Sequence, residues 1–166
     1  MSDRIETFDV GETVRIIAAT RSGDITVVGG EPHSVRVAID GGGAGAYEIE
    51  QIGDVISVEP RRKGRFSGFS ADLILSVPAG AGLELSCTSG DITVQSPVAE
   101  LRASVASGDI RVDRVAGVCR VNSASGDIRI NAAGDAEVNT ASGTVRLGMI
   151  DRSLRLNAAS GNVYVD

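Results

Sequence analysis

Few residues in this chain could do chemistry, and their pattern points away from catalysis. The single histidine, His33, lies in a Gly-Gly-Glu-Pro-His-Ser stretch with no nucleophile or orienting carboxylate at a recognisable spacing. The repeated serines stand in Ser-Gly, not in the Gly-x-Ser-x-Gly turn that exposes a nucleophile between a strand and a helix. Because covalent and acid–base catalysis need a convergent set of such groups, we expect a protein that is not an enzyme.

Aspartates at a fixed place in a repeat are the next candidates, because Ca²⁺ binds carboxylate oxygens. Asp91, Asp109 and Asp127 form such a series. Arginines two residues further on offer these carboxylates a competing partner, and the glycine-rich nonapeptide of calcium-binding β-rolls is missing. We therefore expect no metal and no cofactor, and a calcium-dependent β-helix protein is an alternative.

The two cysteines, Cys87 and Cys119, fall in the apolar phase of the pattern, where cysteine usually behaves as a small buried hydrophobe. The repeat described below places them two coils apart, about 9 to 10 Å along the stack, which is too far for a disulfide. We expect two buried structural thiols.

One segment outside the repeat gathers cations and aromatics on a chain whose net charge is -6. Its residues are Arg61, Arg62, Lys63, Arg65, Phe66 and Phe69. Basic residues interleaved with apolar ones can contact an acidic partner or a peripheral anionic membrane surface. A solvated loop without a partner is the other interpretation. The overall negative charge argues against nucleic acid as a ligand.

The elements that must position these residues follow from a repeat. Ser-Gly-Asp-Ile or a close relative begins at Ser22, Ser89, Ser107, Ser125, Ser142 and Ser160. The last five copies are 18, 18, 17 and 18 residues apart. Helical repeats need about 33 residues or more, so this period suits one coil of a β-solenoid.

Apolar and polar residues alternate on both sides of each Ser-Gly, as strands half-buried against a core require. One inward column holds Leu83, Leu101, Cys119, Ala136 and Leu154, and another holds Ile92, Ile110, Ile128, Val145 and Val163. Glycine between the columns supplies the positive φ of a sharp corner. We predict an all-β fold, a single-stranded parallel β-solenoid (β-helix) with coils of about 18 residues. Parallel crossovers favour the right-handed form.

The chain has the size of one domain, so we expect residues 1–166 to form a single β-solenoid domain. Residues 1–82 are predicted as irregular N-terminal coils with loops, and residues 83–166 as the regular Ser-Gly-Asp-Ile repeats. If the period extends through the whole chain, the stack has roughly nine coils.

Several features together resemble a known family. They are Phe8 and Val14, the first Ser-Gly-Asp-Ile at residues 22–25, Asp72 with the Val-Pro-Ala-Gly turn at residues 77–80, and the serial coils that follow. The chain is similar to the bacterial β-strand-repeat domains labelled "putative adhesins", or Toast-rack domains, of cell-envelope stress modules. The resemblance implies a β-solenoid with a role in binding or assembly and without established enzymatic activity. It brings no catalytic residues.

The last coil, with Val163, Tyr164 and Val165, is a candidate assembly edge, because the sequence ends one residue later at Asp166, directly after a corner with no visible cap. We therefore expect a non-catalytic interaction or scaffold module that self-associates as a homo-oligomer through its ends or docks to an envelope-stress or membrane-proximal protein. A polysaccharide-directed β-helix protein is an alternative, although 0 Trp, 2 Tyr and 3 Phe are few for a sugar platform.

The expected location is the cytoplasm. No apolar run reaches the roughly 18 residues that cross a bilayer, and the first residues do not form an export signal.

Overall fold

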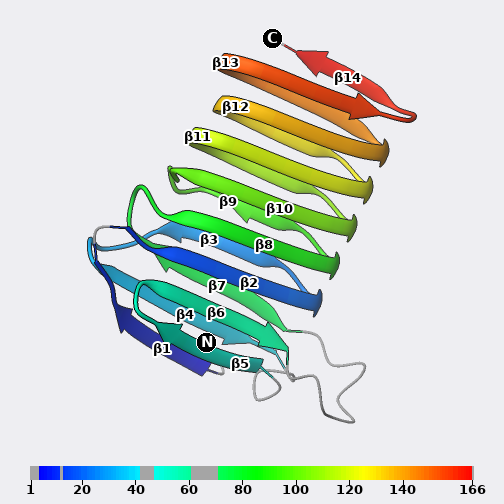
Figure 1. The fold of residues 1–166 in the computed structure, drawn as a ribbon. Helices are drawn as coiled ribbons and strands as arrows, with labels where there is room; N and C mark the ends of the chain where they lie inside the picture. Colours follow the sequence, from blue (N-terminus) through cyan, green and yellow to red (C-terminus); the bar gives the residue numbers. More distant parts are fainter. Residues whose placement is uncertain (1–3, 12, 42–46, 61–70, 166) are drawn as a thin grey trace.

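The computed structural model describes residues 4–11, 13–41, 47–60 and 71–165, which form 14 strands (Figure 1). The all-β prediction is confirmed, and within these ranges no helix could cross a membrane. The strands are β1 (Arg4–Asp9), β2 (Arg15–Ser22), β3 (Ile25–Gly29), β4 (Ser34–Asp40), β5 (Tyr47–Ile52), β6 (Val55–Pro60), β7 (Asp72–Val77), β8 (Gly82–Ser89), β9 (Ile92–Val94), β10 (Glu100–Ser107), β11 (Ile110–Ser125), β12 (Ile128–Ser142), β13 (Thr144–Ala158) and β14 (Asn162–Val165).

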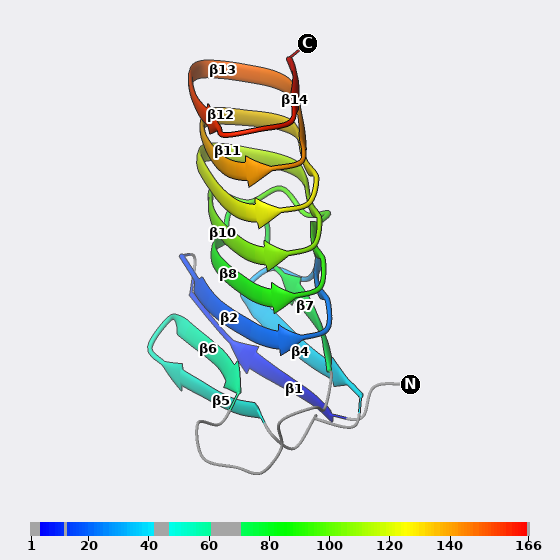
Figure 2. The same cartoon turned by 90° about the vertical axis from the view of Figure 1, so that its right-hand side faces the viewer.

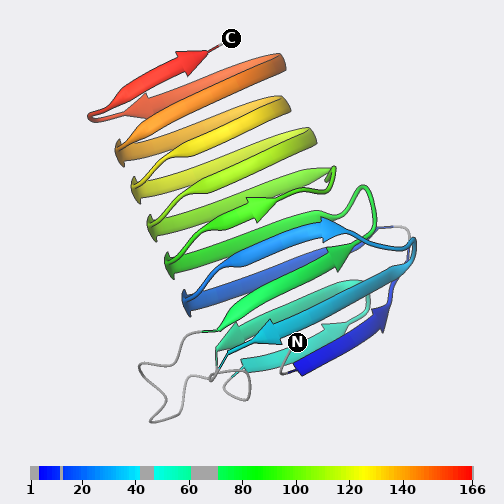
Figure 3. The ribbon, with the colours of Figure 1, turned by 180° about the vertical axis from the view of Figure 1, so that it is seen from behind.

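One continuous sheet folds back on itself and encloses the core between two walls (Figures 1 and 2). The front wall consists of β5, β6, β2, β8 and β10, followed by the second halves of β11, β12 and β13. The back wall consists of β1, β4, β7, β3 and β9, followed by the first halves of the same three long strands and by β14 (Figure 3). Each long strand therefore bends from one wall into the other.

From β8 onward the strands pair in parallel, with equivalent residues of successive repeats side by side. Leu101 pairs with Leu83 on one side and with Cys119 on the other. Hydrogen-bonded residues of this kind are 17 or 18 positions apart. The predicted inward columns are buried in the middle of the stack, where Ile110, Ile128 and Val145 form one of them.

The first repeat belongs to the same stack although it is distant in sequence. Ser22 in β2 pairs with Ser89 in β8, and Ile25 in β3 pairs with Ile92 in β9. The chain leaves the stack after β3 and returns to it at β8. The intervening strands β4 to β7 build the N-terminal end.

The sheet is mixed, so a parallel solenoid running through the whole chain is not what the structure shows. β4 pairs antiparallel with β1 and β7, and β5 pairs antiparallel with β6. Gly53 and Asp54 are the two residues between the paired Ile52 and Val55, and Gly53 has a φ of 59°. A two-residue turn joins antiparallel strands only, which is why the 18-residue period fails here.

The Ser-Gly corners stack on one another, as the repeat predicts. Their glycines have φ between 119° and 142°, namely Gly23, Gly90, Gly108, Gly126, Gly143 and Gly161. A Cβ added to Gly108 would also clash with the carbonyl oxygen of Gly90 in the neighbouring coil. Glycine is therefore required at Gly108 both for its conformation and for close approach of the coils.

Candidate functional site

The basic segment identified in the sequence cannot be placed. Arg61, Arg62, Lys63, Arg65, Phe66 and Phe69 lie outside the described residues, so their contact with a protein or a membrane stays a prediction. His33 lies in the exposed turn between β3 and β4, with a φ of 59°. Its carbonyl oxygen accepts a hydrogen bond from the N–H of Val10 at 3.0 Å. His33 therefore helps to hold this turn against the segment that follows β1.

The repeated aspartates hold neighbouring coils together. Asp91 Oδ1 accepts the backbone N–H of Asp109 at 2.9 Å, and Asp109 Oδ1 accepts that of Asp127 at 2.9 Å. We call the full series the aspartate ladder, and it runs through Asp72, Asp24, Asp91, Asp109 and Asp127 to the N–H of Thr144. Each corner therefore fixes the backbone of the next coil.

This arrangement does not assemble a metal site. In the part of the chain that the structure describes, no group of three or more His, Cys, Asp or Glu side chains could hold a metal ion. One oxygen of each ladder carboxylate is already an acceptor for a backbone N–H. The calcium alternative therefore has no set of converging ligands among the described residues.

Both cysteines are free and buried, as predicted. The Cys87 thiol donates a hydrogen bond to the carbonyl oxygen of Gly23 at 3.2 Å, and burial raises its pKa. Burial raises the pKa of Cys119 to about 12. The nucleophilic form of either thiol is therefore suppressed near neutral pH.

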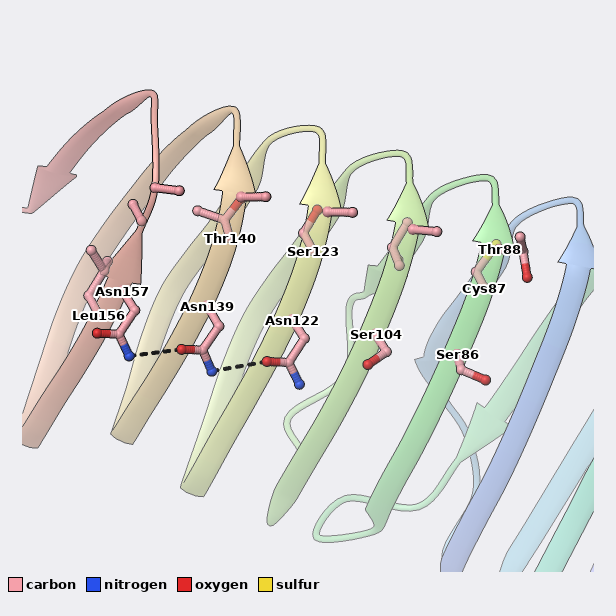
Figure 4. A pocket seen from close by; sticks show the side chains of 16 residues that line it. Ser86, Cys87, Thr88, Ser104, Asn122, Ser123, Asn139, Thr140, Leu156 and Asn157 are labelled. Atoms are coloured by element: carbon pink, nitrogen blue, oxygen red, sulfur yellow. Dashed lines mark hydrogen bonds between the residues drawn. The ribbon is translucent and has the colours of Figure 1, made fainter.

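A shallow groove of about 960 Å³ crosses the front wall from β8 to β13. Mostly short side chains line it, and three asparagines among them form a hydrogen-bonded series (Figure 4). Asn139 donates to Asn122 at 3.0 Å, and Asn157 donates to Asn139 at 2.9 Å. The groove is neutral and offers hydrogen bonds and shape, but no acid or base. The sequence predicts columns of short side chains here, but it does not predict that they line a groove.

The C-terminal end leaves the core columns uncovered. Leu154 is 39% exposed, whereas Ala136, its partner in the preceding coil, is 3% exposed. Val163 and Val165 are 39% and 53% exposed, although their partners Val145 and Leu147 are buried. The structure thus places the predicted assembly edge, including the half-exposed Tyr164, around an open end of the core.

Backbone groups are also available at this end. Among the described strands, β14 pairs with β13 alone, and the second half of β13 pairs with β12 alone. An unpaired strand edge next to exposed apolar side chains is a surface on which another strand can be added. We call this surface the open end and define it by Leu154, Val163, Tyr164 and Val165.

The fold is similar to that of a solved structure. A protein from Clostridium sporogenes described as a "putative cell adhesion protein" is 11% identical, with 98% of each chain covered and a TM-score of 0.53. A "putative adhesin" from Bacteroides fragilis is 11% identical, with 99% of this chain and 98% of that chain covered and a TM-score of 0.42. At this identity the first likeness shows the fold alone.

No curated protein matches this chain. The family assignment rests on a family model, Toastrack DUF4097, which matches residues 5–166 and so takes in both the irregular N-terminal end and the regular coils. This chain belongs to the Toastrack DUF4097 family.

Proposed function

We propose that the protein is a non-catalytic interaction module whose open end pairs with the open end of a second copy. The proposal rests on the exposure of the inward side chains, which are buried in the middle of the stack and exposed in the last coil. Removing exposed apolar surface from water contributes about 25 cal/mol per Å², so covering these side chains stabilises an assembly.

The second copy is the favoured occupant because the open end is complementary to itself. Its exposed apolar side chains meet the same apolar side chains when two copies are related by a twofold axis, which gives a closed dimer. The same operation brings unpaired edges together with antiparallel strand directions, a geometry that β-strands accept. Tyr164 supplies a large aromatic side chain, a residue type enriched at interfaces.

The opposite end of the stack supports this pairing over a head-to-tail polymer. Tyr47 is buried there, and Val35, Val37 and Ile39 of the antiparallel strand β4 are fully buried. The edge strand β5 carries the exposed Glu48 and Glu50, and charged side chains on an edge oppose the addition of another strand.

Absolute mass in solution, measured by light scattering over a range of concentrations, tests the proposal. We expect the wild type to form a dimer and a Val163→Lys/Val165→Lys variant to be monomeric. The matched control is Ala106→Lys/Ala124→Lys, which adds the same charge to exposed positions of the front wall. Thermal unfolding establishes that all three proteins are folded.

A wild type that stays monomeric at all concentrations would overturn the proposal, as would a control variant that dissociates as readily as the end variant. Open-ended growth beyond a dimer would replace the twofold contact with a head-to-tail contact.

We also infer that residues 82–165 wind as a parallel solenoid of about 18-residue coils, the scaffold that presents this end. The pairings from β8 to β14 support the inference, since all of them are parallel. Removal of one whole coil tests it, because a true coil can be deleted without disturbing the contacts of the others.

A further inference from the structure

A second surface, on the back wall, carries a column of arginines. Arg111 in β11 pairs with Arg129 in β12, and Arg129 pairs with Arg146 in β13. All three are exposed, while their neighbours along each strand, such as Ile128 and Ile130, are buried. We call Arg111, Arg129 and Arg146 the arginine column, in which successive residues stand about 4.8 Å apart, the usual distance between paired strands.

The arginine column forms no ion pair among the described residues. The salt bridges found there join Arg15 to Glu84, Arg120 to Glu137 and Arg152 to Asp135. The aspartate ladder runs beside the column, but its Oδ1 atoms accept hydrogen bonds from backbone N–H groups. Like charges placed opposite each other destabilise a sheet, so an anion bound across the column would stabilise it.

Acidic neighbours become fewer toward the C-terminal end of the column. The residues two positions before and after each arginine are Asp109 and Asp113 for the first, Asp127 and Asn131 for the second, and Thr144 and Gly148 for the third. The surroundings of the first arginine are therefore net negative, those of the second are neutral and those of the third are net positive. An anion is attracted most strongly between Arg129 and Arg146.

A hollow of about 380 Å³ lies at that place. Arg129, Asn131, Arg146 and Tyr164 are among the residues that line it. The Arg146 guanidinium carbon lies 5.4 Å from the centre of the Tyr164 ring, a contact that orients the side chain. Asn131 donates one hydrogen bond to Asp113 at 3.3 Å and has a second amide N–H to offer.

We propose that this hollow binds a carboxylate of an acidic polysaccharide, with the sugar chain lying along the arginine column. A guanidinium binds a carboxylate through two parallel hydrogen bonds, and two stacked arginines can hold one carboxylate between them or serve successive sugars. The half-exposed Tyr164 ring can support a sugar ring, and Asn131 can donate to hydroxyl or ring oxygens.

The neighbouring columns favour a saccharide over a membrane. The side chains flanking the arginines on the back wall are polar or small, with Gln95, Asp113 and Asn131 on one side. These polar side chains can hydrogen-bond a saccharide, whereas membrane-binding faces combine cations with many apolar side chains. The exposed Met149 follows Gly148 of the lining, so binding to vesicles is one outcome of the test below. Tyr164 borders both this hollow and the open end, whereas Arg129 and Arg146 lie on the wall, so the two proposals are tested through different residues.

Calorimetric titration with a defined oligogalacturonate tests the proposal. We expect saturable binding by the wild type and a loss of at least about tenfold in affinity for Arg129→Gln/Arg146→Gln, because two charge-assisted contacts are removed. Arg129→Lys/Arg146→Lys keeps the charge but loses the bidentate geometry, so we expect an intermediate affinity. Arg36→Gln/Arg102→Gln removes the same charge from exposed positions elsewhere and should bind like the wild type.

Three outcomes would overturn the proposal. One is an oligogalacturonate affinity that does not distinguish the site variant from the control variant, or no binding at all. Another is equal binding of polyglutamate, which would indicate attraction to any polyanion. The third is binding to anionic phosphatidylglycerol vesicles with no binding to the saccharide. The mass in solution of the Arg129→Gln/Arg146→Gln variant should equal that of the wild type, which separates this test from that of the open end.

Discussion

The core is covered at the N-terminal end of the stack and exposed in the last coil at the other end. At the N-terminal end the core finishes in strands with antiparallel partners, where Val37 of β4 and Val58 of β6 are fully buried. At the C-terminal end the columns finish at Leu154 and Val165, which are exposed. The repeat therefore continues the core through the described coils, and the antiparallel strands cover it at the N-terminal end. Closure uses the part of the chain that departs from the period, in strands β4 to β7.

The largest effect should come from cutting the regular region out of phase. Deletion of residues 108–125 removes one 18-residue unit and joins Ser107 to Gly126, which restores the Ser-Gly corner and lets Asp91 accept the N–H of Asp127. We expect this protein to fold, as circular dichroism and cooperative urea unfolding would show. Deletion of residues 103–119 joins Arg102 to Arg120, which puts Arg120 at the inward place of Ala103, turns the apolar face of this strand outward and should abolish folding.

The opposite result, with both deletions equally folded or equally unfolded, would contradict the inference that the C-terminal half consists of equivalent coils.

A smaller effect distinguishes the interior of the stack from its open end. Ile128 is fully enclosed, so Ile128→Ala should lower the free energy of unfolding by about 2 to 4 kcal/mol. Leu154 is already 39% exposed, and Leu154→Ala in the monomeric Val163→Lys/Val165→Lys background should cost less than about 1 kcal/mol. Urea unfolding of each variant beside its parent measures the two values, and similar losses would show that the last coil is as well packed as the middle.

The smallest effect is a pH dependence of the free energy of unfolding, which tests whether water is excluded from the middle of the stack. Burial raises the pKa of the Cys119 thiol from 9.0 to about 12. The folded state therefore keeps its proton where the unfolded state loses it, so this contribution to stability is complete below pH 9 and is lost as the pH rises toward 12.

Comparison of urea unfolding at pH 8 and pH 10 measures this contribution. We expect the wild type to lose about 1 kcal/mol more between these values than Cys119→Ala does, because one pH unit in this range corresponds to 1.4 kcal/mol for one proton. Equal losses in both proteins would mean that Cys119 is not desolvated in solution.

Local patterns were sufficient to predict the corners and the columns. Period-two alternation identifies Ile110 and Ile128 as inward residues, and the glycine of each Ser-Gly signals the positive φ that the structure shows. These features depend only on residues within one coil and on its repetition. The repeat also identifies the aspartates as a series. Their hydrogen bonds to the next coil could not be predicted without knowing how the coils stack.

The N-terminal end could not be predicted in the same way. Nothing near Ser22 indicates that its neighbour in the sheet is Ser89, since an exposed strand edge accepts any strand with a matching pattern. The antiparallel pairs depend on the turn at Gly53 and on which strand is free to pair. The groove beside Asn139 and the hollow beside Arg146 result from how walls curve, which the order of residues does not specify.

The return of the chain to its first coil has a consequence for folding. Asp91 bonds to Asp24, 67 residues earlier, whereas Asp109 bonds to Asp91 only 18 residues earlier. Closing the longer loop costs about 1 kcal/mol more in chain entropy. We therefore expect the C-terminal coils to form first and to present the edge of β8 as a template on which β2 docks. A strand that is synthesised before the regular coils would then reach its place after them.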